Sequence, residues 1–271
     1  MIKLIVTDID GTLVKDTDVN INNRYFDVIK KLTDKDIKVM VASGRIFNGI
    51  NALFLPISND IIINAMNGAY ISYKNKDLFI SNIHSSYVKS IIEIVNKIDG
   101  LEILLSDQKT DYTNSKDEDY IDLLVNKYES NLKIVDNLLE LDYEKIKIVK
   151  ITLYTTKLDT LKESQIFKEK FNDELNIVVS GKNWIDIMNK NISKGEAIKI
   201  IQDIYGITKE ETVCFGDQEN DLSMFDVSGI SFAVSNAIDD VKSKSNYVIG
   251  SYKEDAVLGV LEKILKDGKY E

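Results

Sequence analysis

The chain has 271 residues, of which 44% are hydrophobic and 29% charged, so it is long enough to fold as one large domain or two smaller ones around a buried core. Its formal net charge of −10 at pH 7 argues against a nucleic-acid partner, because an acidic surface repels an anionic polymer. The single cysteine, Cys214, excludes an intrachain disulfide, and no apolar run approaches the roughly 18 residues of a membrane span, so we expect a cytoplasmic protein with no membrane partner.

The first third of the chain predicts a parallel sheet. Residues 3–9 are apolar on both faces and predict a fully buried strand. A helical pattern over 25–36 and a second buried strand over 37–43 follow it. This strand–helix–strand order is typical of parallel strands joined by helical crossovers. Residues 60–72 predict a further strand and a hairpin around residues 67–68.

The middle of the chain, from about residue 84 to 185, has a different pattern of predicted helices and strands. Helical patterns occupy 85–98 and 160–174, and short strands are predicted over 145–155 and 175–181. No predicted strand of this segment ends in paired aspartates or in a glycine loop. The segment therefore predicts an inserted α+β module.

The last third returns to alternating strands and helices. A helix over 191–205 has a clear start, because Ser193 with Glu196 three residues later forms a capping-box pattern. A strand that runs into an acidic loop follows at 211–221, and two more strand-plus-helix units complete the chain.

These elements predict an α/β protein whose core is a Rossmann-like, doubly wound parallel sheet with an inserted α+β cap domain. We expect the core to comprise residues 1–82 and 186–271. The cap would be residues 83–185.

Two aspartates, Asp8 and Asp10, end the first strand. Residues two apart on an extended chain point the same way, so the carboxylates repel each other unless a cation or a proton lies between them. A hard cation such as Mg²⁺ takes oxygen ligands and suits such a pair. Taken alone, an acidic strand end that caps the following turn is the more common interpretation.

Two further clusters could bind phosphate. Ser43 and Gly44 end the second strand, where a hydroxyl and an unhindered backbone N–H can bind phosphate oxygens. Lys194 lies in the first turn of a helix, where the macrodipole disfavours a cation unless an anion is bound nearby. The alternatives are an ordinary turn at Ser43 and a solvated lysine at 194.

The fourth cluster is the acidic loop over 216–221, again at a strand end. Asp217 could complete a cation site begun by Asp8 and Asp10, and Asn220 offers an amide donor. An acidic loop that merely caps the next helix is the alternative. The four clusters all lie at core strand ends or at the capped helix start, where open α/β sheets bind ligands. Four polar clusters would rarely share this location by chance, so we expect them to form one site.

The segments "DIDGTL", "ASGR", "SKGEAI" and "GDQENDLSMF" resemble, in this order, the four motifs of the haloacid dehalogenase-like hydrolase superfamily. The insert between the second and third motifs resembles that of the Cof-type, subclass IIB phosphatases. The resemblance implies phosphoryl transfer through an aspartyl-phosphate. Asp8 would be the nucleophile, and Asp10 would protonate the leaving oxygen and then activate water.

The resemblance also implies the remaining roles. Mg²⁺ would be held by the Asp8 side chain, the Asp10 backbone carbonyl and the Asp217 side chain. Ser43, Gly44 and Lys194 would bind the transferred phosphoryl group, with Asn220 close by. Asp221 and Thr12 would hold the metal ligands in place without binding the metal themselves. Arg45 could contact substrate or hold the core against the insert, and we favour the second.

We therefore expect a Mg²⁺-dependent phosphatase that hydrolyses a small phosphorylated metabolite, such as a sugar phosphate, as a monomer or homodimer. The insert would close over the crevice and select the substrate. A phosphotransferase or phosphomutase on the same scaffold remains an alternative, and so does a phospho-accepting signalling module.

Overall fold

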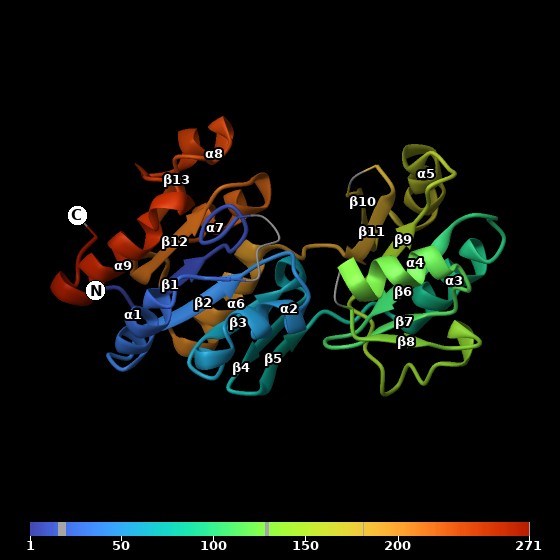
Figure 1. Cartoon of the computed structure of the whole chain (residues 1–271), viewed down its shortest axis with the longest axis horizontal. Helices are drawn as coiled ribbons and strands as arrows, with labels where there is room; N and C mark the ends of the chain where they lie inside the picture. The colour runs from blue at the N-terminus through green and yellow to red at the C-terminus, as the bar shows by residue number, and fades with distance from the viewer. Residues whose placement is uncertain (16–19, 128–129, 181, 271) are drawn as a thin grey trace. The chain divides into compact units, whose positions relative to one another are not determined.

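The computed structural model describes residues 1–15, 20–127, 130–180 and 182–270 (Figure 1). The chain divides into two compact units, which we call the core unit (Met1–Phe79 with Ser193–Glu271) and the insert unit (Ile80–Ile192). The insert unit extends past the expected return at 185–186, because strand β11 (Trp184–Asn189) pairs with other strands of that unit.

The core unit is built on one sheet, which in the described part of the chain has eight strands in the order β14-β13-β12-β1-β2-β3-β4-β5. From β14 to β3 neighbouring strands are parallel, and β4 is antiparallel to β3. The strands are β1 (Leu4–Thr7), β2 (Lys38–Ala42), β3 (Ile62–Ala65), β4 (Tyr70–Tyr73), β5 (Lys76–Ile80), β12 (Thr212–Gly216), β13 (Ile230–Val234) and β14 (Tyr247–Ile249). This arrangement confirms the predicted α/β fold with a parallel core sheet.

The sequence of β1 explains its central place in the sheet. All four of its residues are buried, and it lies between β2 and β12. An apolar run without alternation is stable only where both faces of the strand are covered.

Helices and short helical turns complete the core unit. The α-helices are α1 (Arg24–Thr33), α2 (Phe47–Leu53), α6 (Lys194–Tyr205), α7 (Leu222–Asp226), α8 (Asp239–Lys244) and α9 (Ala256–Asp267). Short 3₁₀ turns cover Leu55–Ile57, Met66–Gly68, Lys209–Glu211, Glu219–Asp221 and Tyr252–Glu254. Within the described ranges, no helix is both long enough and apolar enough to cross a membrane.

Helix α6 begins where the sequence predicts. The Ser193 side chain accepts a hydrogen bond from the Glu196 backbone N–H at 3.1 Å, which satisfies one of the free N–H groups of the first turn. The Glu196 carboxylate pairs with Lys199 at 2.6 Å. The helix ends at Gly206, whose φ of 62° is the left-handed conformation of a glycine C-cap.

The insert unit has its own sheet, in the order β10-β11-β9-β6-β7-β8. Its other elements are β6 (Glu102–Ser106), β7 (Asp111–Thr113), β8 (Leu132–Ile134), β9 (Lys150–Tyr154), β10 (Leu175–Val179), α3 (Ser85–Val95), α4 (Glu118–Asp122), α5 (Thr160–Phe171), a π turn over Leu123–Lys127 and a 3₁₀ turn over Leu138–Glu140. Buried side chains of α3 and α5 share one apolar cluster with β6, β9, β10 and β11.

Two strand predictions for the insert differ from the structure. The strand expected over 145–155 forms only over Lys150–Tyr154, because the N–H groups of Lys145 and Ile146 bond back to the Asp142 carbonyl in a turn. The strand expected over 175–181 forms over Leu175–Val179, and Gly181 lies outside the described residues.

Two glycines within helices should respond to alanine in opposite ways. A Cβ on Gly195 would lie 2.2 Å from the Ser223 backbone oxygen, so Gly195→Ala should lower the free energy of unfolding by about 1–3 kcal/mol. A Cβ on Gly259 in α9 would meet no atom of the described residues within 4 Å, so Gly259→Ala should raise the free energy of unfolding by about 0.5–1 kcal/mol. Urea unfolding of both variants measures the difference, and a stabilised Gly195→Ala protein would contradict the close packing of α6 against α7.

Candidate active site

The predicted site residues come from the ends of three adjacent strands and from one helix start. Strands β1, β2 and β12 lie side by side and run parallel (Figure 1), so the loops that follow them leave from the same edge of the sheet. Asp8 and Asp10 follow β1, Ser43 follows β2, and Asp217 follows β12.

Lys194 occupies the centre of this group and is not solvated, since only 1% of it is exposed. Its Nζ donates to Asp8 Oδ1 at 2.5 Å and to Asp221 Oδ1 at 2.6 Å. Burial lowers the pKa of Lys194, but the charges of Asp8 and Asp221 outweigh burial, so the net shift of this pKa is upward. The ammonium therefore stays charged and joins the two carboxylates.

Asp8, Asp217 and Asp221 form a buried acidic cluster, with carboxylate oxygens within 4.8 Å of one another. Burial raises the pKa of Asp8 well above its usual value; Lys194 opposes this shift, and Asp221 and Asp217 add to it. Burial and the charge of Asp221 also raise the pKa of Asp217. Burial is the larger cause of both upward pKa shifts, and the excess of negative charge left by one ammonium among three carboxylates adds to it.

The donor set of this cluster fits a divalent cation. Asp8 Oδ2 is buried and has no hydrogen-bond partner among the described residues. Both oxygens of Asp221 already have partners, because Oδ1 accepts from Lys194 and Oδ2 accepts from the backbone N–H groups of Asp217 and Gln218 at 2.8 and 3.0 Å. Asp217 accepts from the Thr12 hydroxyl at Oδ1 and from Gln218 Nε2 at Oδ2, at 3.0 and 3.1 Å. Asp8 Oδ2 is thus the atom of the cluster best able to offer oxygen to a hard cation.

The loop after β1 closes directly onto Asp217. Thr12 Oγ1 donates to Asp217 Oδ1 at 3.0 Å. Gly11 has a φ of 81°, and a Cβ there would lie 2.2 Å from Asp217 Oδ2. Only glycine permits both this backbone conformation and this approach.

The Asp10 carboxylate is held apart from the acidic cluster by Arg45. Arg45 Nη2 donates to Asp10 Oδ1 at 2.5 Å and Nε donates to Oδ2 at 2.9 Å, a bidentate pair. Ser43 Oγ lies 3.5 Å from Asp10 Oδ2. The expectation that Arg45 holds the core against the insert missed this pair, because the partner is set by the adjacency of β1 and β2 and not by local pattern.

Asn67 joins the site, although the sequence suggested only a turn at this position. Asn220 Nδ2 donates to Asn67 Oδ1 at 3.0 Å, and a Cβ on Gly44 would lie 3.4 Å from Asn67 Nδ2. The sequence signal that could have identified Asn67 is its position. Residues 66–68 directly follow β3, and β3 is parallel to β2.

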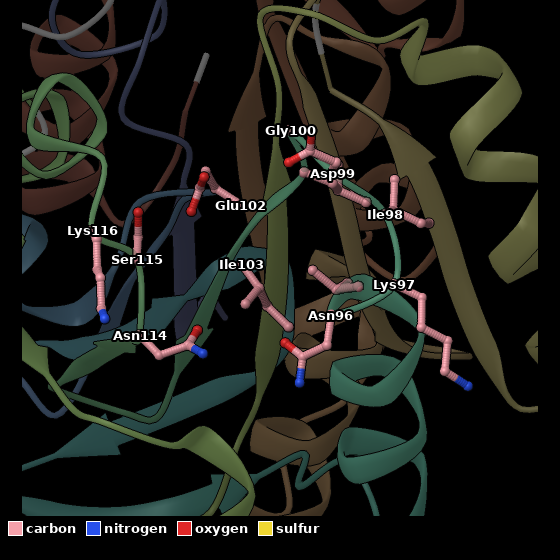
Figure 2. Close-up of a pocket in the computed structure, with 12 residues that line it drawn as sticks. Asn96, Lys97, Ile98, Asp99, Gly100, Glu102, Ile103, Asn114, Ser115 and Lys116 are labelled. Carbon is pink, nitrogen blue, oxygen red and sulfur yellow. The ribbon is translucent and has the colours of Figure 1, made fainter.

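The insert unit has a separate pocket of about 370 Å³ (Figure 2). Residues of the α3–β6 connection, such as Asn96 and Gly100, line one side, and Asn114 and Lys116 after β7 line the other. None of the predicted site residues lines this pocket.

Replacement of Lys194 tests the buried ion pairs. Lys194→Met would leave Asp8 and Asp221 buried without their cation, so the free energy of unfolding should fall by about 3–5 kcal/mol. Lys199→Met is the matched control on the same helix, because its pair with Glu196 is solvent-exposed and its loss should change stability by less than about 1 kcal/mol. Equal denaturation midpoints for the two variants would contradict a central role for Lys194.

Comparison with known proteins identifies the family of this chain. The model of the haloacid dehalogenase-like hydrolase family matches residues 5–261. A relative from Escherichia coli strain K12, named 5-amino-6-(5-phospho-D-ribitylamino)uracil phosphatase, is 28% identical over 267 residues, which are 98% of this chain and 97% of the relative. A crystal structure of a Eubacterium rectale protein has a TM-score of 0.92 at 30% identity and covers 97% of this chain and 99% of that one.

A sugar phosphatase of subclass IIB has a TM-score of 0.74 at 24% identity, with 97% of this chain and 98% of that chain covered, which shows that the fold is shared. The family model spans most of the chain, and the resemblance seen in its four motifs is confirmed. The chain is a phosphatase that belongs to the haloacid dehalogenase-like hydrolase family.

Proposed function

We propose that this protein is a Mg²⁺-dependent phosphatase that hydrolyses a small phosphorylated metabolite through an aspartyl-phosphate on Asp8. One observation supports the proposal: Asp8 lies at a strand end, its Oδ1 is bound to the buried Lys194, and its Oδ2 is buried with no hydrogen-bond partner in the part of the chain that the structure describes. Such a carboxylate has one fixed orientation and an oxygen available for a ligand or an electrophile.

Two steps follow from these roles. In the first, an oxygen of Asp8 attacks phosphorus, the bond to the leaving oxygen breaks, and protonated Asp10 gives its proton to that oxygen. In the second, Asp10 takes a proton from water, which attacks the phosphorus of the acyl-phosphate. Inorganic phosphate leaves and the Asp8 carboxylate is restored.

The main barrier in the first step is repulsion between an anionic nucleophile and an anionic phosphoryl group. Lys194 offsets part of this charge, and donors from Ser43, Gly44 and Asn220 would bind the phosphoryl oxygens in the loose transition state. Bound Mg²⁺ would supply the remaining charge neutralisation. The Asp8 and Asp217 side chains and the Asp10 backbone carbonyl would hold it.

Arg45 and Asp221 take supporting roles in this proposal. The guanidinium of Arg45 donates to both oxygens of Asp10. This pair would orient the Asp10 carboxylate as the base of the second step, and it would have to open for Asp10 to carry the proton of the first. Asp221 binds Lys194 and the backbone of the loop that carries Asp217, so it would orient the metal ligands without being one. Thr12 would steady Asp217 through its hydroxyl group.

The substrate class is a small phosphate monoester. Sugar phosphates should be tested first, together with 5-amino-6-(5-phospho-D-ribitylamino)uracil, the compound in the name of the Escherichia coli relative. Release of inorganic phosphate from such a panel would identify the preferred compound.

Asp8→Asn should abolish turnover, because the amide cannot form the acyl-phosphate. Hydrolysis of an aryl phosphate in the presence of Mg²⁺ should fall by roughly 10³-fold or more. Asp203→Asn, at an exposed aspartate of α6, should keep wild-type rates. Undiminished turnover in Asp8→Asn would rule out Asp8 as the nucleophile.

Mg²⁺ should stabilise the folded chain in the absence of substrate. A cation that binds only the native state at a hundred times its Kd adds about 2.7 kcal/mol, so the Tm should rise with Mg²⁺ concentration. Asp217→Asn should reduce this rise, whereas Asp240→Asn, at an exposed pair with Lys244, should not. The same Mg²⁺ response in Asp217→Asn and wild type would show that the acidic cluster does not bind the metal.

A further inference from the structure

The segment Met66–Gly68 has an unusual backbone. Met66 and Asn67 are consecutive non-glycine residues with φ of 51° and 54°, and Gly68 follows with a φ of 110°. Side-chain-bearing residues rarely adopt this left-handed region, and they keep it only where surrounding contacts hold them there. Two such residues in a row therefore call for a structural or functional reason.

The contacts that hold the segment come from two phosphate-binding elements of the proposed site. The Asn67 N–H donates to the Ser43 carbonyl at 3.0 Å, and the Met66 N–H donates to the Arg45 carbonyl at 2.9 Å. A Cβ on Gly68 would lie 2.4 Å from the carbonyl oxygen of Ser193. The segment thus packs between the loop after β2 and the start of α6.

The Asn67 side chain continues this bridge to the loop after β12. Its Oδ1 accepts from Asn220 Nδ2 at 3.0 Å, so the acceptor end of the amide is already used. Its Nδ2 and Oδ1 lie 3.4 and 3.5 Å from the position of a Cβ on Gly44, so the amide lies beside the glycine whose backbone N–H is assigned to the phosphoryl group.

We propose that Asn67 is a further phosphoryl-binding residue, whose side-chain NH₂ donates a hydrogen bond to an oxygen of the phosphoryl group held by Ser43 and Gly44. This assignment rests on the proposed function, because it shares the same anion site. The left-handed backbone at residues 66 and 67 is the means by which the amide reaches that site. The ligand class is a tetrahedral oxyanion, which needs several converging N–H donors.

Two substitutions separate this role from a purely structural one. Asn67→Asp keeps the side-chain oxygen that Asn220 needs and suits a left-handed backbone, but it replaces the donor by a negative charge. Asn67→Gly tolerates the same backbone and removes the side chain altogether. Asn75→Asp is the matched control, because Asn75 also has a positive φ, of 59°, and its side chain binds the exposed Asn59.

Inorganic phosphate is the probe, measured by calorimetric titration and as a competitive inhibitor of aryl phosphate hydrolysis. Loss of one hydrogen bond to a charged group weakens binding by about tenfold or more, so Asn67→Gly should raise the Ki for phosphate by about that factor. Asn67→Asp should raise it further, because its carboxylate repels the anion. Asn75→Asp should match the wild type in both measurements.

Each result of these measurements either supports or overturns the assignment of Asn67. If Asn67→Asp binds phosphate as tightly as wild type, Asn67 serves only as an acceptor for Asn220 and the assignment is overturned. If charge at position 67 prevents folding, Asn67→Gly decides alone, and an unchanged Ki overturns the assignment. A wild-type chain that neither binds phosphate nor hydrolyses the ester would overturn the proposed function itself, whereas an active wild type with unaffected variants overturns the role of Asn67 only.

Discussion

The buried ammonium of Lys194 between Asp8 and Asp221 is the interaction on which the rest of the site depends. A charge in the protein interior is tolerated only when it is paired and hydrogen-bonded, and Lys194 is almost fully buried. The helix start that carries it must therefore stay within hydrogen-bond reach of the loops that follow β1 and β12. This requirement joins segments 186 and 27 residues apart in sequence and holds Asp8 in one orientation.

The backbone around this ion pair is packed so closely that glycine is needed at several points. Gly195 lies against the Ser223 carbonyl, and Gly11 lies against the Asp217 carboxylate. A side chain at Gly195 would push α7 away from the helix start that carries Lys194, and one at Gly11 would displace the Asp217 carboxylate. Close backbone approach and charge pairing therefore support each other in this site.

Charge is distributed unevenly across the site. Asp8, Asp217 and Asp221 gather excess negative charge where a cation would be stable. In the proposed site, Ser43 and Gly44 after β2 and the amide of Asn67 would instead offer neutral hydrogen-bond donors to phosphoryl oxygens. An acidic region beside a donor-lined region is the combination that metal-assisted phosphoryl transfer requires.

The sequence alone determined the α/β class and the polar residues that follow the core strands, because burial pattern and backbone periodicity are local properties of a chain. It also determined the family, through the order of four motifs. Only the tertiary structure decided that Lys194 is buried, that Arg45 binds Asp10, and that Asn67 binds Asn220 across 153 residues of sequence. Those contacts depend on which strands lie side by side and on how closely their loops approach, and no local pattern encodes either.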